Sequence, residues 1–528
     1  MRSESTLYRN GRLYSPADPR ATALLVTDDR IAWLGPESEA PSAGVDRIVE
    51  LDGAVVTPAF VDAHVHCTDT GLALTGLELR RTGSRDEVLA AVAGYATRLA
   101  PDALVIGHGW DESGWPDPRP PNPAELDRAA GGRRVYLAQA SAHSAVVSAA
   151  LLAAAPGAAG AAGYDASGWL RLDAHHRVRE VALGSIGAAQ RRDAQLAALR
   201  RAASRGIAAL HECGGPGTSG EADFTGLLSL AAEGGLPEVY GYWGELGAVA
   251  KARELGAVGA GGDLYADGAL GAHTAHLRTS YVDSVDAGYG HGYLNATQVA
   301  GHLVACVRHG LQGGFHAIGD AAISTVLDGF AAAAAQVGLE RLRAGRHRIE
   351  HLELLDKALI RRLVGYGVTA SLQPAFDQLW GGTDGMYAQR LGPGRALAAN
   401  PIAELAGVGV PLAFGSDSPV TPIDPWGGVL AAMGHHNPAY RISARAAFAA
   451  HTRGGWRAAG VDGEGTLGPG APATFAVWDV PAGAALVGGL PRLLPTDPDE
   501  SPPPPPTCRS TVLRGTVIYD RDHDRNEV

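Results

Sequence analysis

Apolar, strand-like runs alternate with Ala- and Leu-rich helical stretches through the middle of the chain, and this alternation limits the fold more than any other feature. The pattern is typical of repeated βα units around a parallel sheet. Eight strands are predicted, at residues 60–66, 207–211, 239–243, 264–266, 314–316, 349–351, 368–372 and 412–414. Eight such units close into a TIM (β/α)8 barrel. We therefore expect an α/β fold with a barrel over residues 58–459.

The two ends of the chain have a different pattern. Short apolar runs separated by turn residues occur in residues 1–57 and again in residues 460–528. Runs of this kind predict β-strands, so both ends are expected to contribute to one small β-sandwich. Residues 67–200 lie between the first two barrel strands. That is far longer than an ordinary connection of about 2 to 6 residues plus a helix, so an inserted subdomain is predicted there.

Two patches of the insertion are rich in polar and aromatic residues, at residues 107–112 and 141–144. They are candidates for a lid over an active site, with His108, Trp110 and His143 as substrate-binding residues. Packing and capping within loops explain the same residues equally well.

Composition narrows the class of partner. The 528 residues include 44 basic and 56 acidic side chains, a net charge of -12, which argues against a nucleic-acid surface and favours a small-molecule substrate. An uncharged stretch at residues 144–164 is mostly Ala and Gly and contains Pro156, so no membrane partner is expected. The four cysteines have no paired spacing, and the first residues lack the apolar core of a signal peptide, which favours the cytoplasm. A homo-oligomer is one open option.

Two histidines end the first predicted barrel strand. Side chains alternate along a strand, so His64 and His66 point the same way. Their Cα atoms are then roughly 6 to 7 Å apart, which lets both imidazoles reach one divalent cation. With 19 histidines in the chain, one His-x-His is expected by chance, so the evidence lies in the context.

That context is a set of further ligand-type residues at strand ends. His316 ends the fifth predicted strand, His351 ends the sixth and Asp417 follows the eighth. Active sites of TIM barrels lie at the C-terminal ends of the strands. The five residues are therefore predicted to hold Zn²⁺ or another divalent metal, which turns a bound water into a hydroxide nucleophile. Asp417 is also the predicted catalytic general acid/base, which takes a proton from the water and returns it to the departing nitrogen.

Four motifs of the chain resemble the amidohydrolase superfamily. They are Thr-Pro-Ala-Phe-Val-Asp-Ala-His-Val-His, Phe-His-Ala-Ile-Gly-Asp, His-Arg-Ile-Glu-His and Phe-Gly-Ser-Asp-Ser-Pro. Two further motifs, Gly-Trp-Asp-Glu-Ser and Asp-Gly-Ala-Leu-Gly-Ala-His-Thr-Ala, are similar to amidohydrolase family 3 and its N-substituted formamide deformylase-like branch. The resemblance implies a barrel with a composite sandwich, metal ligands at His64, His66, His316, His351 and Asp417, and hydrolysis of a carbon–nitrogen bond.

The chain departs from this superfamily on the fourth strand. Many relatives bridge two metals with a carboxylated lysine there, but the matching residue is Asp263, and the only lysines, Lys251 and Lys357, are predicted in helices. Asp263 is expected to lie where its strand enters the barrel and to fall short of both metal positions. One metal ion is therefore favoured over two.

Four other residues have open roles. Cys213 is either an extra metal ligand, as in the D-aminoacylase relatives, or a buried inert thiol. Asp263 is a second candidate for an extra ligand. Asp267 orients the substrate or a ligand histidine, or else caps a helix. Glu350 is expected to point away from the metal, because it alternates with His351 along one strand.

Three functions compete for this set of residues. The favoured one is a metal-dependent hydrolase that cleaves a non-peptide carbon–nitrogen bond in an amide or N-substituted formamide. The alternatives are a deaminase that releases ammonia from a ring amidine, and a non-catalytic amidohydrolase-like binding protein. All five ligand-type residues are present, which disfavours the binding protein.

Overall fold

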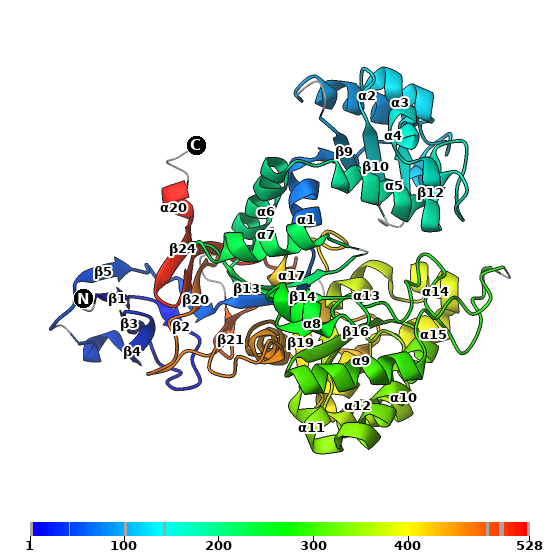
Figure 1. Cartoon of the computed structure of the whole chain (residues 1–528). Coiled ribbons are helices and arrows are strands. Elements are labelled where there is room, and N and C mark those ends of the chain that lie inside the picture. Colours follow the sequence, from blue (N-terminus) through cyan, green and yellow to red (C-terminus); the bar gives the residue numbers. More distant parts are fainter. Residues whose placement is uncertain are drawn as a thin grey trace. The chain divides into compact units, whose positions relative to one another are not determined.

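The computed structural model describes residues 4–41, 43–99, 103–140, 144–216, 218–284, 286–481, 485–495 and 501–524. The chain divides into two compact units (Figure 1). The first unit comprises Met1–His66 and Leu199–Val528, and the second comprises Cys67–Ala198. The insertion expected at residues 67–200 covers the second unit.

A parallel eight-stranded sheet forms the centre of the first unit. In sheet order its strands are β19 (Leu412–Phe414), β18 (Thr369–Leu372), β17 (Arg348–His351), β16 (Gln312–Ala317), β15 (Gly259–Ala260), β14 (Glu238–Trp243), β13 (Ile207–Gly214) and β7 (Phe60–Val65). Two backbone hydrogen bonds join the edges: the amide of His66 donates to Ser418 O at 3.0 Å, and the amide of Asp417 donates to His64 O at 2.8 Å. The predicted TIM barrel is therefore confirmed.

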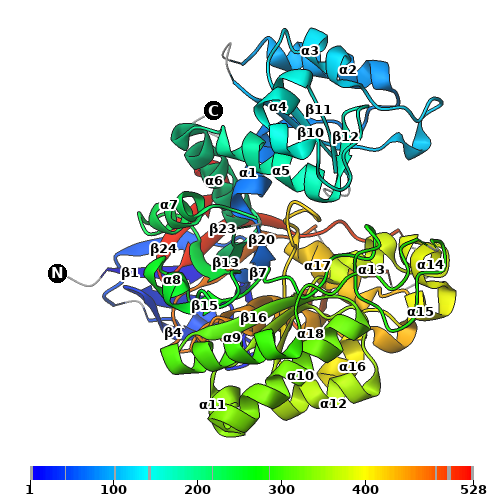
Figure 2. The same cartoon turned by 45° about the vertical axis from the view of Figure 1, so that its right-hand side comes forward.

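Helices follow the strands along the chain. They are α7 (Glu221–Ala231), α8 (Val249–Glu254), α9 (Ala296–His309), α10 (Asp320–Val337), α11 (Leu339–Ala344), α12 (Lys357–Tyr366), α13 (Pro374–Trp380), α14 (Met386–Leu391), α15 (Pro393–Leu397), α16 (Ile402–Gly407), α17 (Pro425–Met433), α18 (Ala444–Ala449) and α19 (Gly455–Ala458). Figure 2 shows α9, α10, α11 and α12 grouped outside β16. Among the described residues, no helix is both long and apolar enough to cross a membrane.

Local sequence signals explain where these helices begin and end. Asn295 and Gln298 form a capping box at the start of α9, and Gly310, whose φ is 66°, caps its C-terminus. The carboxylate of Asp356 caps the start of α12, and Gly367, again with a φ of 66°, caps its C-terminus. A glycine without a Cβ adopts this left-handed conformation readily.

The fourth strand differs from the prediction. It was expected at residues 264–266, but β15 is Gly259–Ala260, and pairing resumes only at Tyr265, which bridges to His316. Between the two pairings the chain bulges at Gly261 and Gly262. A Cβ at Gly261 would lie 2.3 Å from the backbone nitrogen of Gly314, and Gly262 has a φ of 74°. The bulge places Asp263 after the C-terminal end of β15 rather than where the strand enters the barrel.

Two further sheets of the first unit share one apolar core. The first contains β4 (Arg30–Gly35), β3 (Ala23–Thr27), β1 (Ser5–Arg9) and β5 (Arg47–Glu50). The second joins both ends of the chain, with β2 (Arg12–Leu13), β6 (Val55–Pro58), β20 (Phe475–Asp479), β23 (Thr507–Leu513) and β24 (Thr516–Asp520). Leu24 and Ile31 pack with Phe475 and Val512 in the core. A small hairpin, β21 (Leu486–Val487) and β22 (Leu490–Pro491), follows β20.

The second unit has a five-stranded sheet of its own. Its order is β12 (Trp169–Arg171), β11 (Ser144–Val147), β10 (Val135–Gln139), β9 (Val105–Trp110) and β8 (Leu77–Glu78). Its helices are α1 (Cys67–Thr75), α2 (Arg85–Ala96), α3 (Pro123–Ala129), α4 (Ala149–Ala154) and α5 (Leu172–Gly184), and α6 (Ala188–Ala203) leads back to β13. Two apolar clusters, one around Val178 and one around Trp110, pack on this sheet.

Candidate metal centre

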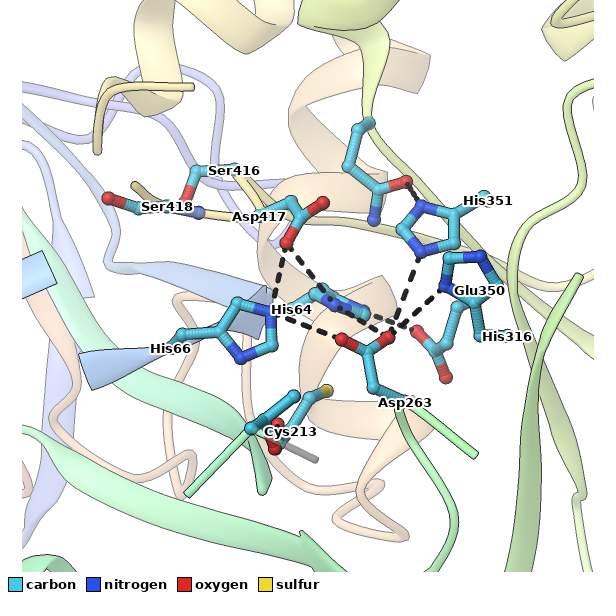
Figure 3. Close-up of polar contacts among 12 residues, drawn as sticks. His64, His66, Cys213, Asp263, His316, Glu350, His351, Ser416, Asp417 and Ser418 are labelled. Atoms are coloured by element: carbon cyan, nitrogen blue, oxygen red, sulfur yellow. Dashed lines mark hydrogen bonds and ion pairs between the residues drawn. The ribbon is translucent and has the colours of Figure 1, made fainter. Parts of the chain in front are cut away.

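Six ligand-type side chains meet at the C-terminal ends of the barrel strands (Figure 3). They include all five predicted ligands: His64 and His66 at the end of β7, His316 of β16, His351 of β17, Asp417 after β19, and in addition Asp263 after β15. Alternation along β7 turns His64 and His66 to the same side. His351 and Asp417 have left-handed backbones, with φ values of 72° and 54°. Such non-glycine residues are uncommon and concentrate at functional sites.

Asp263 lies among the four histidines. Its Oδ1 is 3.4 Å from Nε2 of His64, 3.4 Å from Nδ1 of His316 and 3.9 Å from Nε2 of His351. Its Oδ2 is 3.2 Å from Nε2 of His66. The expectation that Asp263 lies where its strand enters the barrel, short of the metal positions, is therefore wrong, because its oxygens contact all four histidines. The physical reason is the glycine bulge after β15, which no strand-based register predicts.

Asp417 also contacts the two histidines of the first barrel strand. Its Oδ1 lies 3.1 Å from Nε2 of His66 and 3.5 Å from Nε2 of His64. The backbone amide of Asp417 donates to His64 O, so the loop after β19 is fixed to β7. The two carboxylates, Asp263 and Asp417, thus flank the histidine pair of the first strand.

Hydrogen bonds to the far ring nitrogens orient three of the histidines. Nδ1 of His64 donates to Glu350 at 2.9 Å, and Nδ1 of His351 donates to the side-chain oxygen of Gln373 at 2.8 Å. Nε2 of His316 lies 3.3 Å from Gly268 O, so it donates there. Each of these bonds leaves the opposite nitrogen with its lone pair toward Asp263, which is the arrangement that a metal ligand needs.

Glu350 points into the barrel, so the expectation that it points away is wrong. Arg348 and Glu350 share the inward side of β17 by strand alternation, and both are fully buried. His351 joins them because its φ of 72° breaks the alternation at the strand end. The prediction assumed a regular strand up to His351, and it therefore placed the Glu350 side chain on the wrong side of the strand.

A buried arginine neutralises Glu350. Arg348 donates from Nε to Glu350 Oε1 at 2.6 Å and from Nη2 to Glu350 Oε2 at 2.8 Å. It also donates to Nδ1 of His211 at 2.9 Å and to the hydroxyl of Ser371 at 2.8 Å. Burial raises the pKa of Glu350, but Arg348 and His64 outweigh burial and hold it below its usual value. Glu350 is therefore a negatively charged hydrogen-bond acceptor for His64.

Replacing Glu350 with Gln is expected to weaken metal binding by about 10- to 100-fold, because His64 loses the charged partner that orients its ring. The change also leaves Arg348 buried without its counter-charge, which costs about 3–5 kcal/mol of stability. Metal titration and thermal unfolding separate the two effects. The double variant Glu350→Gln, Arg348→Met removes both charges and is expected to regain stability but not metal affinity. Unchanged metal affinity in Glu350→Gln would contradict the orienting role.

The charges at the centre favour a cation. Burial raises the pKa of Asp263, but His64, His316 and His351 outweigh it and hold the pKa well below its usual value. Burial lowers the pKa of His66, but Asp263 and Asp417 outweigh it and raise the pKa well above its usual value. The buried carboxylates thus create a negative potential at the ring nitrogens that face them.

The donor set fits a divalent metal. Nε2 of His64 and Nε2 of His351 are buried and have no hydrogen-bond partner among the described residues. Ligands about 2.1 Å from a tetrahedral ion lie roughly 3.4 Å apart. Ring nitrogens of the centre lie 3.1 to 3.9 Å from oxygens of Asp263 and Asp417. Asp263 forms a compact group both with His64 and His66 and with His316 and His351, so it reaches both histidine pairs.

Neither lysine takes part. Lys251 lies in α8 and pairs with Glu221 and Glu245 at 2.6 and 2.9 Å, and Lys357 begins α12. Cys213 of β13 is fully buried and groups with His64 and Glu350. Burial raises the pKa of the Cys213 thiol, and His64 lowers it by a smaller amount. Both roles considered for Cys213, extra ligand and buried thiol, agree with this position.

The predicted substrate-binding residues lie in different surroundings. His108 of β9 is partly exposed, and its Nε2 lies 3.5 Å from Glu78. Trp110 is fully buried in the core of the second unit, where its indole donates to Leu137 O at 2.9 Å. Asp267 is also fully buried and accepts backbone N–H bonds from residues 276, 318 and 319. Neither Trp110 nor Asp267 has surface for a substrate in this structure, and His143 lies outside the described residues.

Sequence reasoning missed two neighbours of the centre. Gln373 directly follows β18, as Asp417 follows β19, so its position after a barrel strand was an available signal. Tyr265 lies just after the bulge that follows β15, and its hydroxyl is 3.3 Å from Asp263 Oδ2. Sequence reasoning assigned Tyr265 to the interior of a strand and therefore did not predict that it lies beside the ligands.

The chain matches the amidohydrolase family over residues 47–519. It is 28% identical over 418 residues to the putative amidohydrolase YtcJ of Bacillus subtilis, a match that covers 73% of this chain and 74% of the relative. Over a shorter stretch of 156 residues it is 28% identical to N-substituted formamide deformylase of Arthrobacter pascens, covering 29% of each protein.

A solved structure supports the same grouping. An uncharacterized metal-dependent hydrolase from Pyrococcus furiosus aligns with a TM-score of 0.74 and 25% sequence identity. The alignment covers 90% of this chain and 98% of the archaeal one. It therefore extends well beyond the barrel strands that carry the centre.

Proposed function

The chain belongs to the amidohydrolase family of metal-dependent hydrolases, and from this premise we propose that its centre hydrolyses a carbon–nitrogen bond of an amide or N-substituted formamide. The observation that carries the proposal is the position of Asp417, whose carboxylate lies 3.1 Å from Nε2 of His66 beside a compact set of histidines. A carboxylate at that place is suited to move a proton between a water and a departing nitrogen.

The residues that would hold the metal are His64, His66, His316, His351, Asp263 and Asp417. When bound, a divalent metal such as Zn²⁺ polarises the substrate carbonyl and lowers the pKa of a water toward about 7. Asp263 reaches both histidine pairs, so its carboxylate would be available to an ion at either pair, and this favours two ions over the single ion first expected. The earlier preference for one ion assumed that Asp263 falls short.

Asp417 performs the proton transfers of the proposed reaction. Its carboxylate accepts a proton from the attacking water while the water oxygen bonds to the carbonyl carbon. The carbon–nitrogen bond then breaks, and Asp417 returns the proton to the nitrogen, so that an amine and a carboxylic acid leave. A neutral amine is a far better leaving group than its anion, which is why the returned proton is needed. General acid/base groups of this kind contribute about 10²- to 10⁴-fold to rates.

The substrate class rests on the local likeness to N-substituted formamide deformylase. A screen of N-formyl, N-acyl and cyclic amides, run with the metal-loaded and the chelator-treated protein, tests it. We expect metal-dependent release of an amine, with formate from N-formyl compounds. Ammonia release from ring amidines without amine release would instead establish the deaminase. Metal binding without any turnover would establish the binding protein.

A further inference from the structure

One tyrosine hydroxyl reaches the centre from the chain just after the bulge that follows β15. The hydroxyl of Tyr265 donates to Oδ2 of Asp263 at 3.3 Å, and that same oxygen lies 3.2 Å from Nε2 of His66. The Tyr265 ring packs edge-on against His316, with ring centroids 4.8 Å apart. A backbone bridge between Tyr265 and His316 holds both residues in register. The phenol is thus positioned by the strand that carries a ligand histidine.

Tyr265 differs from the ligands in its exposure. Its relative exposure is 37%, whereas His64, Asp263, His316, His351 and Asp417 are all buried. Tyr265 therefore belongs both to the centre and to the solvent-facing surface. A molecule that enters the centre from solvent meets a neutral hydrogen-bond donor at this residue.

The bond between Tyr265 and Asp263 is easily exchanged. At 3.3 Å it is longer than an ordinary O–H···O hydrogen bond of about 2.7–2.8 Å, and bonds weaken as they lengthen. Asp263 also contacts the four surrounding imidazoles, at 3.2 to 3.9 Å. A charged oxygen closer to the hydroxyl than Asp263 Oδ2 would therefore form a stronger bond with it.

The chemistry of an amide provides such an acceptor. During hydrolysis the carbonyl carbon becomes tetrahedral, and negative charge collects on its oxygen. A prepositioned donor near that oxygen lowers the barrier, because its bond strengthens as the charge develops. We propose that the Tyr265 hydroxyl donates to this oxygen, which makes Tyr265 a catalytic residue. The inference rests on the proposed amide hydrolysis and adds the residue that recognises the reacting carbonyl.

The test replaces Tyr265 with Phe, which removes only the hydroxyl, and uses Tyr289→Phe as the matched control. Tyr289 lies in the same connection between β15 and α9 and is 57% exposed. On an amide that the wild-type protein hydrolyses, Tyr265→Phe is expected to lower kcat per bound metal about 10²-fold, with KM changed little. Metal content is expected to match the wild type, and Tyr289→Phe to keep full activity.

Three outcomes would overturn this inference. Equal kcat in Tyr265→Phe and wild type would remove Tyr265 from the reaction while leaving the proposed function intact. Loss of metal with normal kcat per bound metal would make Tyr265 a positioning residue for Asp263 and nothing more. If the wild-type protein itself hydrolyses no amide, the proposed function fails and the assignment of Tyr265 fails with it.

Discussion

Replacing Asp417 with asparagine is expected to lower kcat by about 10²- to 10⁴-fold while the protein stays folded. Asparagine has nearly the same shape but accepts no proton, so the water loses its base and the departing nitrogen loses its acid. Asp417 also faces His64 and His66 and is a proposed ligand. The rate is therefore measured per bound metal, with circular dichroism as the check on folding.

Asp424→Asn is the matched control for this change. Asp424 lies in the same loop after β19, but its carboxylate caps α17 by accepting from the amide of Gly427. Asparagine caps helices as well as aspartate does, so full activity is expected. Near-normal turnover in Asp417→Asn would exclude Asp417 as the general acid/base, whatever the metal content.

Replacing His351 with Ala is expected to weaken metal binding by about 10²-fold or more. Zinc binding by four ligands is worth about 10–16 kcal/mol, so one ligand accounts for roughly a quarter of that. His64→Ala is expected to act in the same way. Metal content after dialysis against a buffered series of free zinc concentrations gives the change in affinity directly.

His435→Ala and His436→Ala are the controls. His435 is as deeply buried as His351, yet its Nε2 lies 3.4 Å from Asp377, and Nδ1 of His436 bonds the same aspartate at 3.1 Å. Neither histidine contacts the proposed ligands, so wild-type metal affinity is expected. Equal loss of metal in the His351 and His435 variants would mean that loss of packing, not loss of a ligand, explains the effect.

Much of the fold and the core of the centre could be predicted because the signals are local. His64 and His66 share a strand whose period is two, so their common direction follows from the sequence. The barrel rule then places His316, His351 and Asp417 at one end of a parallel sheet.

The errors arose where the backbone leaves its regular geometry. The bulge at Gly261 and Gly262 moves Asp263 into the centre, and the left-handed His351 puts Glu350 on the inward side of β17. Neither event changes the apolar pattern that strand assignment uses. For Trp110 the sequence left two roles open, because aromatic residues suit both a substrate surface and a core, and only the packing around Trp110 decides between them.

The central claim is that His64, His66, His316, His351, Asp263 and Asp417 hold the catalytic metal. Crystals of the protein grown with zinc, measured on both sides of the zinc absorption edge, test it most directly. We expect anomalous peaks within about 2.0–2.3 Å of the facing ring nitrogens and carboxylate oxygens, one at each histidine pair with Asp263 between them. A single peak would still support the metal centre, but it would mean that Asp263 does not bridge two ions. Zinc bound elsewhere, with no peak among these six residues, would contradict the account.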